Sequence, residues 1–173
     1  MTTPVLAVDS LRKAFGGVDA VVDASFRVDA GELVALIGPN GAGKTTCFNL
    51  VNGQLSPDAG SVSLVGERID GLPPRAIARR GVGRTFQVAA TFASMTVREN
   101  VQMALLARDG RQNTLTTRAT GLARAEADAL LERVRMTRFA DQGCATLAYG
   151  DAKRVELALA LACRPRLLLM DEP

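Results

Sequence analysis

The segment GPNGAGKT, from Gly38 to Thr45, limits the possible folds of this chain more than any other feature. It follows the apolar run Leu33–Ile37 and precedes a helical pattern, KTTCFNLVNG, in which Gly53 is the predicted C-terminal stop. The apolar run predicts a strand that is buried on both faces, as in a parallel sheet. The order of strand, glycine-rich turn and helix therefore predicts an α/β fold.

The spacing of this segment fits the pattern GxxxxGK[ST], which has a physical basis in phosphate binding. Glycines let the backbone curl so that successive N–H groups point at phosphate oxygens, and the following helix adds the positive end of its dipole. We expect Lys44 to reach the β- and γ-phosphates, Thr45 to ligate Mg²⁺ and Thr46 to donate near the α-phosphate. A glycine-rich turn without a ligand is the alternative, but the motif in this context favours a nucleoside triphosphate site. The predicted phosphate-binding residues are Asn40, Gly41, Ala42, Gly43, Lys44, Thr45 and Thr46.

The last residues, LLLMDEP, combine an apolar strand pattern with two adjacent carboxylates, Asp171 and Glu172. In an open α/β sheet, ligands bind beyond the carboxyl ends of the strands, so the two apolar strands should deliver Lys44 and Asp171 to the same edge. Asp171 can then hold Mg²⁺ through water, and Glu172 can polarise an attacking water. A helix N-terminus with acidic residues after a core strand is the alternative.

Composition excludes several other classes of protein. The chain has 173 residues, enough for one domain, and its apolar runs are far shorter than the roughly 20 residues of a membrane-spanning helix. No signal-peptide pattern follows Met1, so we expect a cytoplasmic protein. A net charge of +3 gives no support for nucleic-acid binding, and the absence of histidine excludes catalysis by imidazole within this chain. Cys47, Cys144 and Cys163 are widely spaced, which predicts free buried thiols.

The remaining pattern alternates strands and helices around a helical block. Thr96 and Glu99 have the spacing of a capping box at the start of a helix. The block from about Val88 to Gly150 is almost purely helical, which predicts a helical insertion in an α/β core. Strands are expected at Val5–Leu11, Ser61–Val65, Gly83–Gln87 and Leu167–Met170, and helices at Pro74–Arg80, Met95–Arg108, Ala119–Arg138 and Asp151–Cys163.

Taken together, these motifs resemble the ATP-binding cassette family, the ATPase subunits of ABC transporters. GPNGAGKT stands at the family's Walker A position, LLLMDEP at its Walker B position, and LAYGD (Leu147–Asp151, the signature segment) where the family has LSGGQ. The resemblance extends from Val5 to Pro173. It implies an α/β P-loop NTPase fold of the ABC cassette type, with a parallel core sheet, an N-terminal antiparallel β portion and a helical subdomain.

Several site assignments come only from this resemblance. Gln87, in GRTFQ, stands at the Q-loop position and is implied to sense the γ-phosphate and Mg²⁺. Phe15, in KAFGG, stands where the family has an aromatic residue that stacks on adenine. Taken alone, Gln87 could be a polar strand end, Phe15 a core phenylalanine, and the signature segment a helix cap. In the signature segment, the residues implied to face ATP on a second cassette are Ala148, Tyr149, Gly150 and Asp151.

The resemblance also predicts the domain organisation, and the sequence departs from the family's pattern in two places. We expect one cassette over residues 1–173, with a nucleotide-binding core at 1–87 and 151–173 and a helical subdomain at 88–150. Ala148 stands where the family has the serine of LSGGQ. The family's segments beyond Walker B, including a histidine that senses the γ-phosphate, have no counterpart. We therefore expect a chain that is incomplete at its C-terminus, with poor solubility and weak or no turnover.

A finer resemblance is to the ATPase of branched-chain amino acid uptake systems, carried by GPNGAGKTTCFNLVNG, GLPPRAIARRGVGRTFQ, MTVREN and LAYGD. It implies an ATP- and Mg²⁺-dependent subunit on the cytoplasmic side of the inner membrane. Its partners would be a second cassette, permease subunits and, indirectly, a periplasmic binding protein, with no nucleic acid. The alternatives are an importer of urea or short-chain amides, a soluble cassette ATPase, and a non-catalytic nucleotide-binding fragment. The implied catalytic residues are Glu172, Lys44 and Gln87, and the implied Mg²⁺ ligands are Thr45, Gln87 and Asp171.

Overall fold

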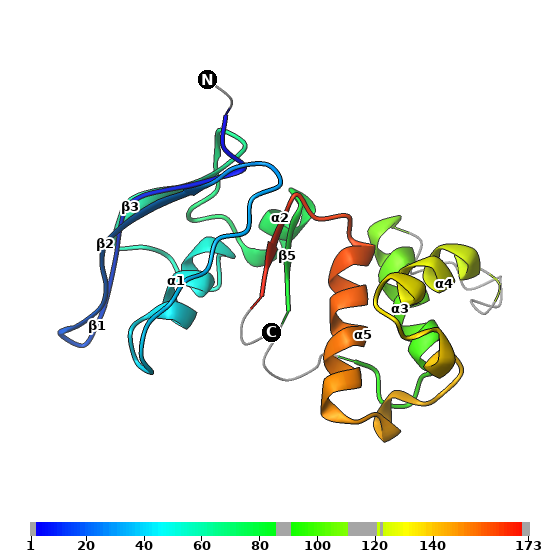
Figure 1. The fold of residues 1–173 in the computed structure, drawn as a ribbon. Helices are drawn as coiled ribbons and strands as arrows, with labels where there is room; N and C mark the ends of the chain where they lie inside the picture. The colour runs from blue at the N-terminus through cyan, green and yellow to red at the C-terminus, as the bar shows by residue number, and fades with distance from the viewer. Residues whose placement is uncertain (1–2, 86–90, 111–120, 122, 171–173) are drawn as a thin grey trace. The chain divides into compact units, whose positions relative to one another are not determined.

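The computed structural model describes residues 3–85, 91–110, 121 and 123–170. The chain forms two compact units, residues 1–82 and residues 83–173 (Figure 1). None of the helices in the described ranges has the length and apolar character that a membrane-spanning segment needs.

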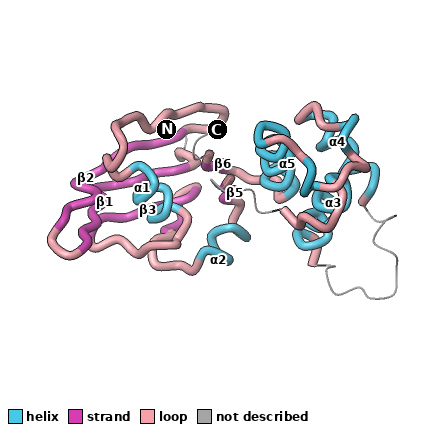
Figure 2. Tube along the Cα trace, turned by 90° about the horizontal axis from the view of Figure 1, so that it is seen from below, coloured by secondary structure: helices cyan, strands magenta, loops and turns pink. Residues whose placement is uncertain are grey.

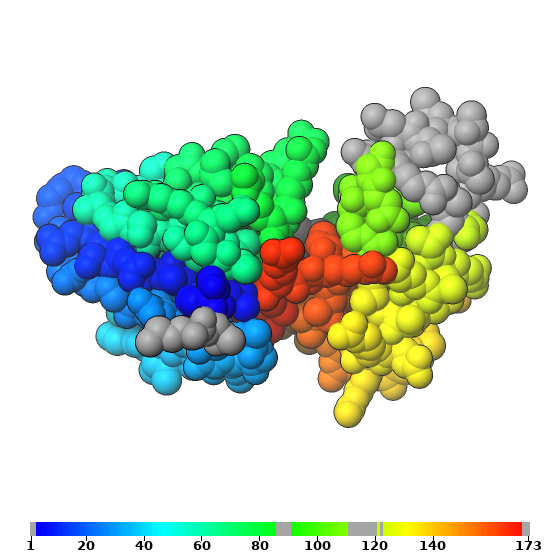
Figure 3. All heavy atoms as spheres, turned by 90° about the horizontal axis from the view of Figure 1, so that it is seen from above, coloured from blue at the N-terminus to red at the C-terminus, as the bar shows by residue number. Residues whose placement is uncertain are grey.

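The first unit contains a four-stranded antiparallel sheet with the order β2-β1-β3-β4. Its buried side chains come from alternate positions on neighbouring strands: Leu6 pairs with Leu64, and Val8 with Val62. The space-filling view shows the blue strand β1 directly beside the teal strand β3 (Figure 3). The strands are β1 (Leu6–Phe15), β2 (Val18–Val28), β3 (Ala59–Leu64) and β4 (Glu67–Arg68), which confirms the antiparallel β portion predicted near the N-terminus.

Two short helices complete the first unit, and α1 lies against the sheet (Figure 2). α1 (Lys44–Val51) buries Cys47, Leu50 and Val51, and the chain then turns at Gly53, which has φ +77° as predicted for a helix stop. α2 (Pro74–Arg79) begins at a proline, whose missing N–H is not needed in the first turn.

The second unit is a helical cluster with a small sheet. β5 (Val82–Arg84) pairs with β6 (Leu167–Leu169), and the Thr85 N–H donates to the Leu169 carbonyl at 3.0 Å. The helices are α3 (Val97–Arg108), α4 (Arg124–Arg133) and α5 (Tyr149–Ala162), with 3₁₀ turns at Thr137–Phe139 and Cys144–Thr146. Their common core consists of Val97, Val101, Leu105, Ala127, Leu130, Leu131, Val134, Met136, Ala140, Cys144, Val155, Ala158 and Ala162.

The predicted capping box at the start of α3 is confirmed. The Thr96 hydroxyl accepts from the Glu99 N–H at 3.2 Å, and the Glu99 carboxylate accepts from the Thr96 N–H at 2.8 Å. The Glu99 carboxylate also accepts from the Thr96 hydroxyl at 3.0 Å. The two bonds that the carboxylate accepts, from the Thr96 N–H first and from the Thr96 hydroxyl second, lower the pKa of Glu99.

The strand predicted at Leu33–Ile37 is wrong. These residues have no strand conformation, and Leu33 and Ile37 are 87% and 90% exposed. A strand requires hydrogen bonds from neighbouring strands, and among the described residues the two sheets are built only from β1–β4 and from β5 with β6. An apolar run indicates that a segment prefers burial, but it supplies no pairing partner.

The long helix predicted at Ala119–Arg138 is shorter in the structure, where α4 ends at Arg133. Arg135 has a left-handed φ of +58°. The Met136 N–H donates to the Leu131 carbonyl at 2.8 Å, and the Arg135 N–H donates to the Glu132 carbonyl at 3.0 Å. This pair of bonds is a Schellman motif, which ends a helix and is usually marked in the sequence by glycine.

Candidate functional site

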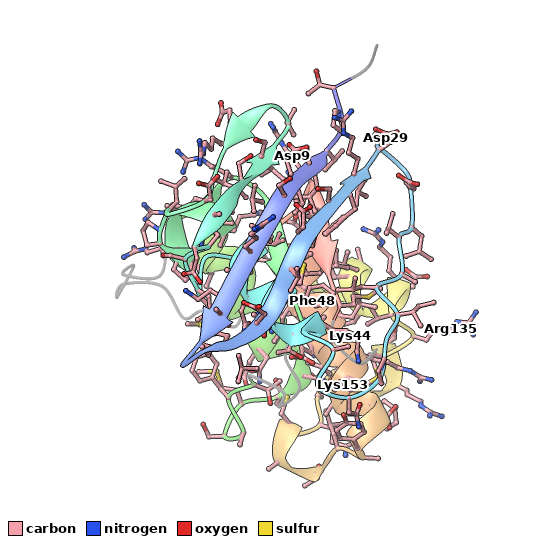
Figure 4. The ribbon with its side chains drawn as sticks, turned by 90° about the vertical axis from the view of Figure 1, so that its left-hand side faces the viewer. Asp9, Asp29, Lys44, Phe48, Arg135 and Lys153 are labelled. Carbon is pink, nitrogen blue, oxygen red and sulfur yellow. The ribbon has the colours of Figure 1, made fainter. Side chains whose placement is uncertain are left out.

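The phosphate loop, Gly38–Thr45, leads directly into α1, as Figure 4 shows at Lys44. Gly41 and Gly43 both have left-handed backbone conformations, with φ of +83° and +81°. The Lys44 ammonium donates to the carbonyl oxygens of Gly38 at 2.7 Å and Pro39 at 2.8 Å. The ammonium is therefore held beside the loop that precedes its own helix.

The N-terminus of α1 has the chemical character of an anion site. Its N-cap is Gly43, which has no side chain to occupy the free N–H groups of the first turn. The first turn carries Lys44 and no acidic residue. Thr45 is exposed and Thr46 is half-buried on this turn. The helix dipole and Lys44 thus contribute positive potential at the same place.

Gly43 also joins the phosphate loop to strand β2. An ideal Cβ at this position would lie 2.0 Å from the Ala20 carbonyl oxygen and 3.6 Å from Val21 Cγ2. Ala20 lies at an irregularity in the pairing of β1 with β2, because Lys13 pairs with Val21 whereas Ala14 pairs with Asp19. Only glycine permits this approach of the loop to the strand.

Phe15 lies at the end of the β1–β2 hairpin, next to the turn residues Gly16 and Gly17. Phe15 as a whole residue is 46% exposed, which disfavours the alternative of a core phenylalanine. The Val21 side chain faces Gly43, and the cross-strand partner of Val21 is Lys13. Because paired residues share a face and side chains alternate along a strand, Lys13 and Phe15 lie on the face that meets the start of α1.

Sequence reasoning missed Asp58, which contacts the end of β1. Its carboxylate accepts from Lys13 Nζ at 2.6 Å and from the Ala14 N–H at 2.8 Å. These two bonds lower the pKa of Asp58, the Lys13 bond having the larger effect. No local pattern marks Asp58, since its partners lie 44 and 45 positions away in the chain.

The signature segment forms the start of α5 in the second unit. Ala148 is the N-cap in extended conformation, and the helix begins at Tyr149, slightly before the predicted Asp151. Tyr149 is 71% exposed, and Lys153 Nζ lies 5.7 Å from the centre of its ring. Asp151 is in the first turn, where its carboxylate lies 3.5 Å from Arg154 Nη1. The segment thus presents an exposed helix N-terminus, as both the phosphate and the helix-cap interpretations require.

The predicted residues Gln87, Asp171 and Glu172 lie outside the described residues. The structure therefore brings together one part of the predicted site, within the first unit: the phosphate loop, Thr46 and the hairpin that carries Phe15. The site roles of all these residues stay predictions.

Comparison with known proteins identifies relatives over the whole chain. The chain is 42% identical over 183 residues to the high-affinity branched-chain amino acid transport ATP-binding protein BraF of Pseudomonas aeruginosa. It is 40% identical over 185 residues to LivG of Escherichia coli, which has the same description. Both alignments cover 100% of this chain and 71% of the relative.

The fold is likewise similar to solved cassettes. The ADP conformation of MJ1267, an ATP-binding cassette of an ABC transporter, superposes with a TM-score of 0.84 at 28% identity. That alignment covers 99% of this chain and 70% of MJ1267. Residues 21–173 match the ABC transporter family. Since this match covers most of the chain, and relatives at 40% identity or more cover all of it, the chain belongs to the ABC transporter family.

Proposed function

We propose that this chain is the ATP-binding and hydrolysing subunit of an importer for branched-chain amino acids. The observation that carries the nucleotide part is the phosphate loop, in which Gly43 opens α1 and Lys44 is held beside Gly38 and Pro39. The cargo is supported by the names of the relatives, BraF and LivG. An importer of urea or short-chain amides stays the alternative cargo assignment.

In this proposal the first unit contacts both the phosphates and the base of the nucleotide. The backbone N–H groups of Gly41–Thr46 and the dipole of α1 receive the phosphates, and Lys44 neutralises charge on the β- and γ-phosphates. The half-exposed ring of Phe15 stacks on adenine. Both parts contact the same strand pair, because Gly43 packs on Ala20 of β2 and Phe15 ends β1.

Hydrolysis requires further residues that the proposal assigns from the resemblance. Thr45, Gln87 and Asp171 offer a hydroxyl, an amide and a carboxylate oxygen, the hard ligands that suit Mg²⁺. Thr45 is an exposed residue on the first turn of α1, beside Lys44, which is compatible with this role. Bound Mg²⁺ would neutralise phosphate charge, and Glu172 would polarise the attacking water.

The proposal includes a second cassette, since the signature segment would act on ATP held by a partner chain. The exposed residues Ala148, Tyr149 and Gly150 at the start of α5 support this assignment. In the proposed organisation, residues 1–87 and 151–173 form the nucleotide-binding core and residues 88–150 the helical subdomain. Permease subunits in the inner membrane, and a periplasmic binding protein beyond them, would complete the importer, with this chain on the cytoplasmic face.

The test is reconstitution with permease subunits in proteoliposomes, together with the matching binding protein. We expect ATP-dependent accumulation of labelled leucine with a branched-chain amino acid permease, at the low rate that weak turnover by this chain allows, and no accumulation of labelled urea with a urea permease. The Lys44→Ala chain is the matched control and should support neither. Uptake of urea but not leucine would contradict the cargo assignment. Association with neither permease, with ATP hydrolysis retained, would favour a soluble ATPase.

Hydrolysis is tested separately by Glu172→Gln. The variant should retain ATP binding and lose phosphate release in the permease-bound complex. Equal phosphate release from both chains would exclude Glu172 as the residue that polarises water. Binding without hydrolysis in the unmodified chain would favour the non-catalytic alternative.

A further inference from the structure

Asp58 makes three hydrogen bonds to residues near the end of β1. Its carboxylate oxygens accept from Lys13 Nζ at 2.6 Å and from the Ala14 N–H at 2.8 Å. Its own N–H donates to the Arg12 carbonyl at 2.9 Å. β3 begins opposite Arg12, so β1 extends beyond β3 from Lys13 onward. The Asp58 side chain takes the place of a neighbouring strand at this point.

The segment that Asp58 holds leads directly to Phe15. Lys13 Nζ, bound to Asp58, lies 5.6 Å from the centre of the Phe15 ring, which is within cation–π range. Beyond Phe15 the hairpin turns through Gly16 and Gly17, whose φ values are +53° and +87°. Glycines have high conformational freedom, so the turn itself fixes the ring only weakly.

A ring that serves as a platform for a base binds it more tightly when the ring is ordered before the base arrives. Ordering a mobile side chain on binding lowers affinity, and a preformed contact removes that cost. An ordinary aspartate carboxyl is already charged near neutral pH, and the bonds from Lys13 and, second, from the Ala14 N–H lower the pKa of Asp58 further. Its contacts are therefore present under the conditions in which nucleotide would bind.

We propose that Asp58 is a positioning residue for the nucleotide base: by holding Lys13 and Ala14, it fixes the Phe15 ring against which the base stacks. The inference rests on the proposed function, because it requires Phe15 to contact the base. It adds a role for a residue outside the known motifs. The inference also predicts that replacing Asp58 lowers the affinity only for ligands that carry a base.

The experiment compares MgATP with Mg²⁺–tripolyphosphate, which has phosphates but no base, by calorimetric titration of the full chain. Asp58→Ala should weaken MgATP binding by about twofold to tenfold, the range expected when one more side chain has to be ordered on binding. It should leave the affinity for tripolyphosphate unchanged. Asp58→Asn keeps an acceptor for the Ala14 N–H, so its effect should be smaller. Equal losses for both ligands would show a general defect of the first unit and overturn the proposal.

A matched control is Asp70→Asn. Asp70 also accepts from a backbone N–H, of Val62 at 3.0 Å, and pairs with Arg68 at 2.9 Å in the same sheet. Asp70→Asn should leave the affinities for MgATP and for tripolyphosphate unchanged. A loss with Asp70→Asn equal to that with Asp58→Asn would overturn the specific role of Asp58.

A double-mutant cycle with Phe15→Ala separates the inference from the function on which it rests. In the Phe15→Ala background, Asp58→Ala should have no further effect on MgATP affinity. Additive losses would show that Asp58 acts by another route. If Phe15→Ala alone leaves affinity unchanged while Lys44→Ala lowers it, the base platform is wrong and the phosphate site stands. If Lys44→Ala also has no effect, the proposed function itself fails.

Discussion

Gly43 packs so closely on Ala20 that a Cβ at position 43 would lie 2.0 Å from the Ala20 carbonyl oxygen. This contact joins the residue before Lys44 to strand β2, whose partner β1 carries Phe15. The phosphate loop and the β1–β2 hairpin that carries Phe15 are therefore packed against each other through backbone atoms. Backbone contacts vary little with side-chain motion, so this contact holds the start of α1 against strand β2.

The first prediction concerns this contact. Gly43→Ala combines a left-handed φ of +81° with the overlap on Ala20, whereas Gly71→Ala has a φ of +79° and no atom within 4 Å. Each variant should lose about 1–2 kcal/mol from the backbone strain. Gly43→Ala should lose about 1–3 kcal/mol more because it overpacks the contact. Urea unfolding followed by circular dichroism measures the difference, and equal losses in the two variants would contradict the account.

The parts of this fold that sequence predicted well are those encoded locally. The glycine pattern placed the start of α1, and the residue pair Thr96 and Glu99 placed the start of α3, because each depends on residues a few positions apart. Leu33–Ile37 shows the limit, since its apolar character predicted a strand without naming a neighbour to pair with. Arg135 shows a second limit, because a left-handed residue other than glycine ends α4 without any signal in the sequence.

In the candidate site, too, only the locally encoded features could be predicted from the sequence. The phosphate loop follows from spacing alone, but the contact of Gly43 with Ala20 depends on the packing of a helix on a sheet. The contacts of Asp58 link positions 44 and 45 residues apart. Such relationships arise from strand register, and a one-residue change of register would remove them.

A second prediction concerns Asn100, which is 2% exposed in α3. Its side chain accepts from the Phe92 N–H at 2.7 Å and donates to the carbonyls of Phe92 at 3.1 Å and Thr96 at 2.9 Å. Asn100→Ala leaves the part-buried Phe92 N–H without this acceptor and removes two bonds to carbonyls, which should cost about 1–3 kcal/mol. Gln142→Ala removes an amide in a less buried place and should cost less than about 1 kcal/mol. Thermal unfolding of both variants checks the order, and similar costs would show that the Asn100 contacts do not hold this segment.

A third prediction concerns acid stability. Arg108 and, to a lesser degree, Arg164 lower the pKa of Glu126 from 4.5 to about 2 by hydrogen bonding. A carboxyl group whose folded pKa is lowered stabilises the fold above its unfolded pKa, and this contribution is lost as pH falls from about 4.5 to about 2. Glu126→Gln should therefore reduce the loss of stability across this range. Because Glu126 is solvent-accessible, the effect should decrease at high salt.

The control for this pH profile is Glu132→Gln, an exposed glutamate on the same helix. It should leave the dependence of the unfolding midpoint on pH unchanged. Profiles of wild type and Glu126→Gln that coincide between pH 2 and pH 4.5 would exclude the ion pairs of Glu126 with Arg108 and Arg164 as a source of acid sensitivity.

The most direct test of the central claim is the affinity of the chain for MgATP with and without the Lys44 ammonium. Calorimetric titration should show saturable binding to the unmodified chain and an affinity at least about tenfold lower for Lys44→Ala, because a charge-assisted contact to phosphate is lost. Arg75→Ala, which removes an exposed cation on α2 in the same unit, should bind MgATP as the unmodified chain does. Equal affinities for the unmodified chain and Lys44→Ala, or no binding by the unmodified chain, would contradict a triphosphate site at Gly38–Thr45.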